Sequence, residues 1–154
     1  MVKQKTLVVY YSRTGNTKKL GLEIAKKLKA SSDEIIDLKE RNRVIIGWLV
    51  SGKDATMKKK TKIKFEKNPS KYDLVIIGTP VWAWTITPAI RTYLSENKFK
   101  KVAFFCTNGG QKGKTFEEME KLSKKPIATL TLLDRKIKKG EYKEELNSFT
   151  KELK

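Results

Sequence analysis

The chain has 154 residues, the size of one domain, and we expect residues 1–154 to fold as a single unit. It carries 35 basic and 17 acidic residues, and the resulting net charge of +18 attracts anionic partners. One Cys and no His exclude an internal disulfide framework, a Cys-based metal cluster and the commonest general base. No metal is expected, and demanding chemistry would come from a bound cofactor.

The sequence shows no sign of a membrane span or of a leader. No apolar run approaches the roughly 20 residues that cross a bilayer, and the first six residues lack a signal-peptide pattern. We therefore expect a cytoplasmic protein. Basic residues are spread along the chain, and the clusters at Lys58–Lys60 and Lys136–Lys139 belong to no nucleic-acid-binding motif. Dedicated nucleic-acid binding is not expected.

Apolar runs alternate with amphipathic stretches along the chain. Strands are predicted at residues 7–11, 34–38, 74–78, 102–106 and 127–133. Helices are predicted at Thr17–Leu28, from Pro88 onwards, from Thr115 onwards and across Tyr142–Leu153. The third of these would begin with a capping box, with Thr115 as N-cap and Glu118 at the third position. The alternation predicts an α/β fold of three layers, with helices on both faces of a parallel sheet.

The segment Arg41–Phe65 is harder to interpret. It contains an apolar stretch around Gly47, with Trp48, followed by basic residues. We expect the helix that joins the second and third strands, with Trp48 packed on the sheet. The alternative is a flap over a ligand.

A hydroxyl-rich turn, Ser12-Arg13-Thr14-Gly15-Asn16-Thr17, stands between the first strand and the first helix. The first N–H groups of a helix have no partner within it, and its dipole places partial positive charge there. A phosphate group satisfies both. The alternative is ordinary helix capping by a Ser or Thr. Three hydroxyls and a Gly in six residues favour phosphate binding, with Arg13 secondary because we expect it to point to solvent.

Two further loops follow strands and should meet the phosphate loop at the carboxyl edge of the sheet. One is Thr79-Pro80-Val81-Trp82-Ala83-Trp84-Thr85, in which one Trp is expected to stack on a planar ligand and the other to pack on the next helix. The other begins at Thr107. Its Gly113-Lys114-Thr115 resembles the end of a nucleotide-binding P-loop, but Asn108 stands where the first Gly is required. A nucleoside triphosphatase is therefore rejected.

These residues resemble the flavodoxins and the small flavodoxin-like FMN-binding proteins. The likeness rests on Ser12–Thr17 and on the block Tyr72–Trp84, and the order of elements extends it over essentially the whole chain. It implies a flavodoxin-like, doubly wound, five-stranded parallel sheet of order 2-1-3-4-5 that holds FMN non-covalently. The cofactor-binding residues that it implies are Ser12, Arg13, Thr14, Gly15, Asn16, Thr17, Thr79, Pro80, Val81, Trp82, Ala83, Trp84, Thr107, Asn108, Gly109 and Gly110. No residue of the chain is assigned a catalytic role, because the flavin carries the chemistry.

The chain departs from the flavodoxin pattern in three ways. It is basic where typical flavodoxins are acidic, and the loop after the fourth strand has no aromatic residue to cover a second side of the flavin. The loop after the third strand has no Gly. The resemblance implies that a peptide of this loop turns over on reduction and stabilises the one-electron-reduced flavin, which needs a positive φ. A loop without Gly favours two-electron use.

The function implied is that of an FMN-binding electron-transfer protein, which exchanges electrons with redox partner proteins that carry acidic docking surfaces. An electron carrier is favoured over a self-sufficient oxidoreductase. The first alternative is an FMN-dependent NAD(P)H or quinone-type reductase. The second is a basic binding module that has kept the fold and lost the flavin.

Overall fold

The computed structural model describes residues 4–39 and 61–154. Five parallel strands form the main sheet: β1 (Thr6–Tyr10), β2 (Ser31–Glu34), β5 (Leu74–Pro80), β6 (Val102–Asn108) and β7 (Thr129–Leu133). Their order in space is β2-β1-β5-β6-β7, which is the expected 2-1-3-4-5 arrangement. The central strands β5 and β6 are buried over almost their whole length because helices cover both of their faces.

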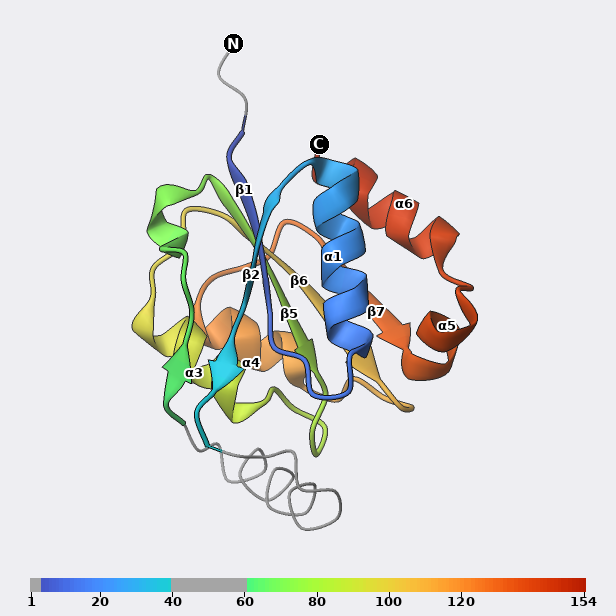
Figure 1. The fold of residues 1–154 in the computed structure, drawn as a ribbon, viewed down its shortest axis with the longest axis horizontal. Helices are drawn as coiled ribbons and strands as arrows, with labels where there is room; N and C mark the ends of the chain where they lie inside the picture. The colour runs from blue at the N-terminus through green and yellow to red at the C-terminus, as the bar shows by residue number, and fades with distance from the viewer. Residues whose placement is uncertain (1–3, 40–60) are drawn as a thin grey trace.

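Helices form the two outer layers (Figure 1). α1 (Asn16–Leu28), α5 (Asp134–Lys139) and α6 (Lys143–Glu152) lie on one face of the sheet, and α3 (Pro88–Glu96) and α4 (Thr115–Leu122) lie on the other. A short 3-10 helix, η1 (Pro69–Lys71), precedes β5. None of the helices in the described ranges is long and apolar enough to cross a bilayer.

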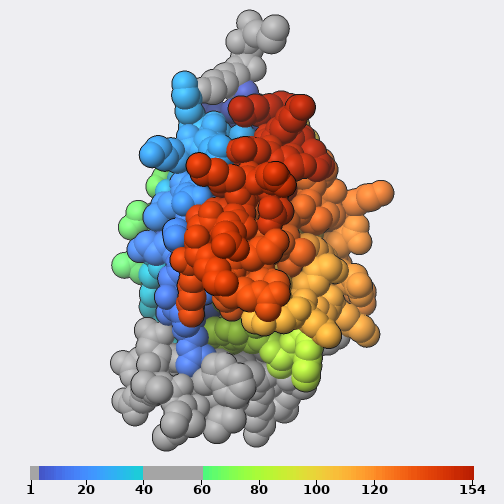
Figure 2. Space-filling view, turned by 90° about the vertical axis from the view of Figure 1, so that its right-hand side faces the viewer, coloured from blue at the N-terminus to red at the C-terminus, as the bar shows by residue number. Residues whose placement is uncertain are grey.

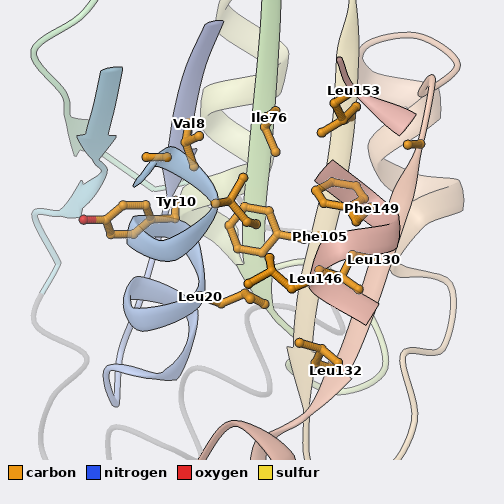
Figure 3. Packing of buried hydrophobic residues seen from close by; sticks show 14 of the residues in the cluster. Val8, Tyr10, Leu20, Ile76, Phe105, Leu130, Leu132, Leu146, Phe149 and Leu153 are labelled. Atoms are coloured by element: carbon orange, nitrogen blue, oxygen red, sulfur yellow. The ribbon is translucent and has the colours of Figure 1, made fainter. Parts of the chain in front are cut away.

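Each face of the sheet has its own core. Val8, Ile76 and Phe105 point toward α1 and α6, where they meet Leu146 and Phe149 (Figure 3). The alternate strand residues point to the other face and pack beneath α3 and α4. Because both faces of the strands are buried, the register of the central strands is fixed and the loops at their carboxyl ends are held on a rigid base.

The second strand lies earlier than predicted. Residues 31–34 pair with β1, and the apolar residues that suggested a strand at 34–38 form two different structures. Ile35 is buried and extends the ladder, since its N–H donates to the carbonyl of Tyr10 at 2.8 Å. The chain then leaves the sheet, and β3 (Ile36–Asp37) pairs antiparallel with β4 (Ile63–Lys64).

The prediction for Arg41–Phe65 lies mostly outside the described residues, Trp48 included. In its described part, residues 63–64 form the strand β4 and not a helix. Two further differences occur later in the chain. The short helix α5 was not predicted, although Gly140 ends it with a positive φ of 73°.

The capping box at the start of α4 is also wrong. The N-cap of α4 is Lys114, and the Thr115 hydroxyl donates to the carbonyl of Lys112. Glu118 is buried and forms an ion pair with Arg91 of α3, at 3.4 Å. The Glu118 carboxylate therefore makes a tertiary contact with α3 and does not cap the N-terminus of α4, although the local sequence pattern predicts that cap.

Candidate functional site

A cavity of about 490 Å³ opens at the carboxyl edge of the sheet, within the size range of ligand pockets. The loops after β1, β5 and β6 line it. Figure 2 shows the yellow-green segment that follows β5 against the gold segment that follows β6. The lining residues are Arg13, Val81, Trp82, Ala83, Trp84, Asn108, Gly109, Gly110 and Gln111. None of these residues is acidic, and the walls are largely aromatic or backbone.

The loop after β1 leaves the N-terminus of α1 open. Gly15 is the N-cap, and its φ of 103° is one that residues with a Cβ rarely adopt. No side chain caps α1 in the described structure. The Ser12 hydroxyl accepts a hydrogen bond from Gly15 N–H at 3.1 Å and orders the turn. The first N–H groups of α1 are therefore left for an anion.

Thr17 connects the loop after β1 to β6. Its buried hydroxyl lies 2.8 Å from the hydroxyl of Thr107, and one of the two donates to the other. Thr107 therefore supports the start of α1 and is not among the residues that line the cavity. Thr79 is also buried away from the cavity, since its hydroxyl donates to the carbonyl of Pro80 at 2.7 Å.

Arg13 departs from its expected orientation. Its guanidinium carbon lies 5.5 Å from the ring centroid of Trp82, within the range of a cation–π contact. The Nη1 atom is buried and has no hydrogen-bond partner among the residues that the structure describes. The side chain turns into the cavity and not out to solvent.

The loop after β5 contains a two-residue turn in an unfavourable conformation. Trp82 and Thr85 exchange two backbone hydrogen bonds, of 3.0 and 3.1 Å, around Ala83 and Trp84. These two central residues have φ angles of 49° and 63°. This is the pattern of a type I′ turn, which usually takes Asn or Gly. The loop has no Gly, yet it holds two residues in the left-handed region, and this conformation costs roughly 1–2 kcal/mol for each residue.

The two Trp side chains differ in burial, and both line the cavity. Trp82 is 9% exposed, belongs to the core beneath α3 and meets the ring of Tyr11 edge-on at 5.6 Å. Trp84 is 68% exposed. Trp82 is thus the residue that packs toward the following helix, as expected for one of the pair, while Trp84 presents a ring at the solvent-exposed side of the cavity.

The loop after β6 forms the remaining wall. Asn108 donates from Nδ2 to the Thr131 hydroxyl at 3.0 Å, while its Oδ1 is buried and has no partner in the described ranges. Gln111 also lines the cavity and was missed in the sequence. Its position directly after Gly109-Gly110 was the available signal. Further along, Lys114 N–H donates to the carbonyl of Trp84 at 2.9 Å and joins two walls of the cavity.

The arrangement fits FMN. The cavity contains a buried donor on Arg13 and a buried acceptor on Asn108, and each lacks a partner in the described structure. Buried polar groups are normally hydrogen-bonded, so a ligand that supplies both an acceptor and an N–H suits them. The pyrimidine end of a flavin carries carbonyl acceptors on either side of an N–H. Its flat ring suits aromatic walls, and its phosphate suits the open end of α1.

Comparison with known proteins gives one family. A family model described as Flavodoxin matches residues 5–153. No curated protein sequence matches the chain.

Solved structures share its fold at low sequence identity. A flavoprotein of Lactobacillus acidophilus NCFM, solved in complex with FMN, is 23% identical with a TM-score of 0.70, covering 89% of this chain and 98% of that one. A candidate flavoprotein of Bacteroides eggerthii DSM 20697 is 23% identical with a TM-score of 0.71, covering 96% and 98%. An NADH:FMN oxidoreductase in its apo form is 11% identical with a TM-score of 0.59, covering 97% and 86%.

Proposed function

Because this chain belongs to the flavodoxin family, we propose that it is an electron-transfer protein that holds FMN non-covalently in the cavity at the carboxyl edge of its sheet. The observation that carries the proposal is an uncapped helix N-terminus in the same group of loops as an aromatic cavity with an unpaired donor and acceptor. When bound, FMN supplies the redox chemistry by accepting and releasing electrons.

Different parts of the site would hold different parts of FMN. The phosphate would bind at the open end of α1, within Ser12–Thr17, through backbone N–H groups and the hydroxyls of Thr14 and Thr17. The ring would lie in the cavity among Trp82, Trp84 and the backbone of Gly109-Gly110. Thr79, Pro80 and Thr107 would support these loops from behind.

An electron carrier is favoured over a self-sufficient reductase. A carrier must bring its flavin close to a partner protein, and Trp84 gives the cavity an exposed aromatic side chain suited to such a contact. The fold itself does not distinguish a carrier from a reductase, because an NADH:FMN oxidoreductase has the same fold. Turnover of NADPH with a quinone by the purified protein alone would establish the reductase and contradict the carrier.

The redox partner would have an acidic docking surface. At the carboxyl edge of the sheet, the loops after β1, β5 and β6, all within the described residues, carry Arg13, Lys112 and Lys114 and no carboxylate. With a net charge of +18 over the chain, this edge attracts an acidic protein and speeds its approach. Association should therefore slow as salt is added.

A visible absorption spectrum of the purified protein, before and after addition of FMN, tests the proposal. Bound flavin gives a yellow protein with an absorption band that shifts on binding. Thr14→Ala combined with Thr17→Ala should weaken FMN by on the order of a hundredfold, since each hydrogen bond to a charged group contributes roughly 1.5–3 kcal/mol. Thr17→Ser retains the hydroxyl and serves as the control. A colourless protein that takes up no FMN would favour the basic binding module.

A further inference from the structure

Arg13 occupies a position in the phosphate loop, but its side chain does not stay with that loop. Its guanidinium lies over the ring of Trp82, which comes from the end of β5. The residue lines the cavity together with Trp82, Ala83 and Trp84. The loop after β1 thus places a permanent positive charge in the part of the site that the ring of a flavin would occupy.

The buried Nη1 atom of Arg13 needs an acceptor that the described part of the chain does not supply. No cavity-lining residue has a carboxylate, and the free Oδ1 of Asn108 makes no hydrogen bond to Arg13. A buried donor without a partner is destabilising, and more so when it belongs to a charged group. A ligand acceptor in this cavity would remove that cost.

We propose that Arg13 binds the isoalloxazine ring of FMN, through an acceptor atom of the ring, and does not bind the phosphate. This proposal rests on the proposed function. The cation–π contact with Trp82 holds the guanidinium at one wall of the cavity. The phosphate would bind elsewhere, at the uncapped N-terminus of α1 and the hydroxyls beside it.

A charged donor on the ring favours the reduced cofactor. Two electrons and one proton convert the neutral oxidised ring into a reduced ring with one negative charge, and a guanidinium stabilises that charge. Arg13 therefore raises the two-electron potential. Each tenfold preference for the reduced form corresponds to about 30 mV for two electrons.

The test compares two ligands that differ only in the phosphate. Dissociation constants of FMN and of riboflavin are measured, from quenching of flavin fluorescence, for the native protein, Arg13→Gln and Arg13→Lys. Lys121→Gln is the control, since it removes one exposed positive charge from the last turn of α4, and Lys121 does not line the cavity. We expect Arg13→Gln to weaken FMN and riboflavin by the same factor, roughly 10- to 100-fold. The dissociation constants of Arg13→Lys should lie between those of the native protein and Arg13→Gln, because Lys keeps the charge and lacks the planar guanidinium with its several N–H donors.

The outcomes separate the alternatives. A loss for FMN with riboflavin unchanged would make Arg13 a phosphate ligand and overturn the proposal, as would no loss for either. A native protein that binds neither ligand would overturn the proposed function itself. The potential gives a second readout: Arg13→Gln should lower it by about 30 mV for each tenfold lost preference, while Lys121→Gln leaves it unchanged. Thermal unfolding of each variant shows that it is folded.

Discussion

Gly113 lies directly against the backbone of Trp84. A Cβ atom placed on Gly113 would be 2.2 Å from the Trp84 carbonyl oxygen and 2.6 Å from the Trp84 Cβ. The φ of Gly113 is 56°, and the next residue, Lys114, donates its N–H to that same carbonyl at 2.9 Å. The loop after β6 therefore holds the strained turn after β5 in place, across the cavity that both loops line.

Gly113→Ala should weaken FMN binding as well as stability. The added methyl group must displace Trp84, and a residue with a Cβ at this φ costs roughly 1–2 kcal/mol in addition. Gly140→Ala is the matched control, because Gly140 also has a positive φ and its Cβ would meet nothing within 4 Å. We expect both variants to lose stability in urea denaturation and Gly113→Ala alone to lose FMN affinity. Equal FMN affinity in both would show that the contact does not shape the cavity.

Ala83→Gly should not destabilise the protein. Ala83 has a φ of 49°, a conformation that costs an L-residue roughly 1–2 kcal/mol and Gly nothing. The extra freedom of Gly in the unfolded chain offsets roughly 0.5–1 kcal/mol of that gain. The same substitution in α1, Ala25→Gly, should destabilise by about 1 kcal/mol or more. Urea midpoints compare the two, and a large loss in Ala83→Gly would mean that the Ala83 methyl makes an essential contact.

Reduction of the FMN-loaded protein should proceed mainly by two electrons. Turning over the peptide between Ala83 and Trp84 would convert the turn to type II′, which takes Gly at its first central position, where Ala83 stands. The bond from Lys114 N–H to the Trp84 carbonyl also holds the turn. A stepwise reductive titration followed by absorbance should show little one-electron-reduced flavin in the native protein and more in Ala83→Gly. Near-complete accumulation in the native protein would refute this.

The two-electron potential should be less negative than in acidic flavodoxins and should depend on salt. The residues that line the cavity include Arg13 and no carboxylate, so a negative charge on the reduced cofactor is stabilised. The exposed basic residues behind the net charge of +18 add a long-range contribution. Salt screens such charges beyond about 8–10 Å at physiological ionic strength, so the potential should fall as salt is added. Spectroelectrochemical titration at two ionic strengths measures the difference. A potential that is both low and indifferent to salt would be incompatible with this account.

Stability should decline at alkaline pH, in part because of Cys106. Burial raises the pKa of its thiol from 9.0 to about 11. In the unfolded chain the thiol ionises near its ordinary pKa, so the unfolded state binds fewer protons between about 9 and 11 and stability falls as pH rises through that window. The loss attributable to Cys106 is on the order of 3 kcal/mol.

Cys106→Ala removes this contribution, and its unfolding free energy should change less between pH 8 and pH 11 than that of the native protein. Buried Tyr10 and Tyr142, each with a pKa raised to about 12 by burial, should leave a residual decline in the variant. Identical pH profiles for the two proteins would show that folding does not raise the pKa of the Cys106 thiol. Urea denaturation at each pH provides the measurement.

The sequence by itself determined the architecture and the edge at which the site lies. Continuous apolar runs such as Leu74–Gly78 are typical of strands covered on both faces. Their alternation with amphipathic helices is compatible with only a few arrangements of a parallel sheet. In a parallel sheet of this kind the carboxyl edge gathers the loops, so Ser12–Thr17, the two Trp residues and Asn108 could be assigned to one region. These are consequences of local periodicity and of connection rules that hold for every such fold.

Only the tertiary structure decided how the side chains in that region are arranged. Glu118 forms an ion pair with Arg91 and does not cap its own helix, and Arg13 contacts Trp82. In both cases the side chain interacts with a residue distant in the chain, which the local sequence pattern does not indicate. Ala83 and Trp84 take a conformation that their own backbone preferences disfavour. It persists because β5 and α3 fix the two ends of the loop and Gly113 packs against its tip. A contact between residues 29 positions apart leaves no local signal in the sequence.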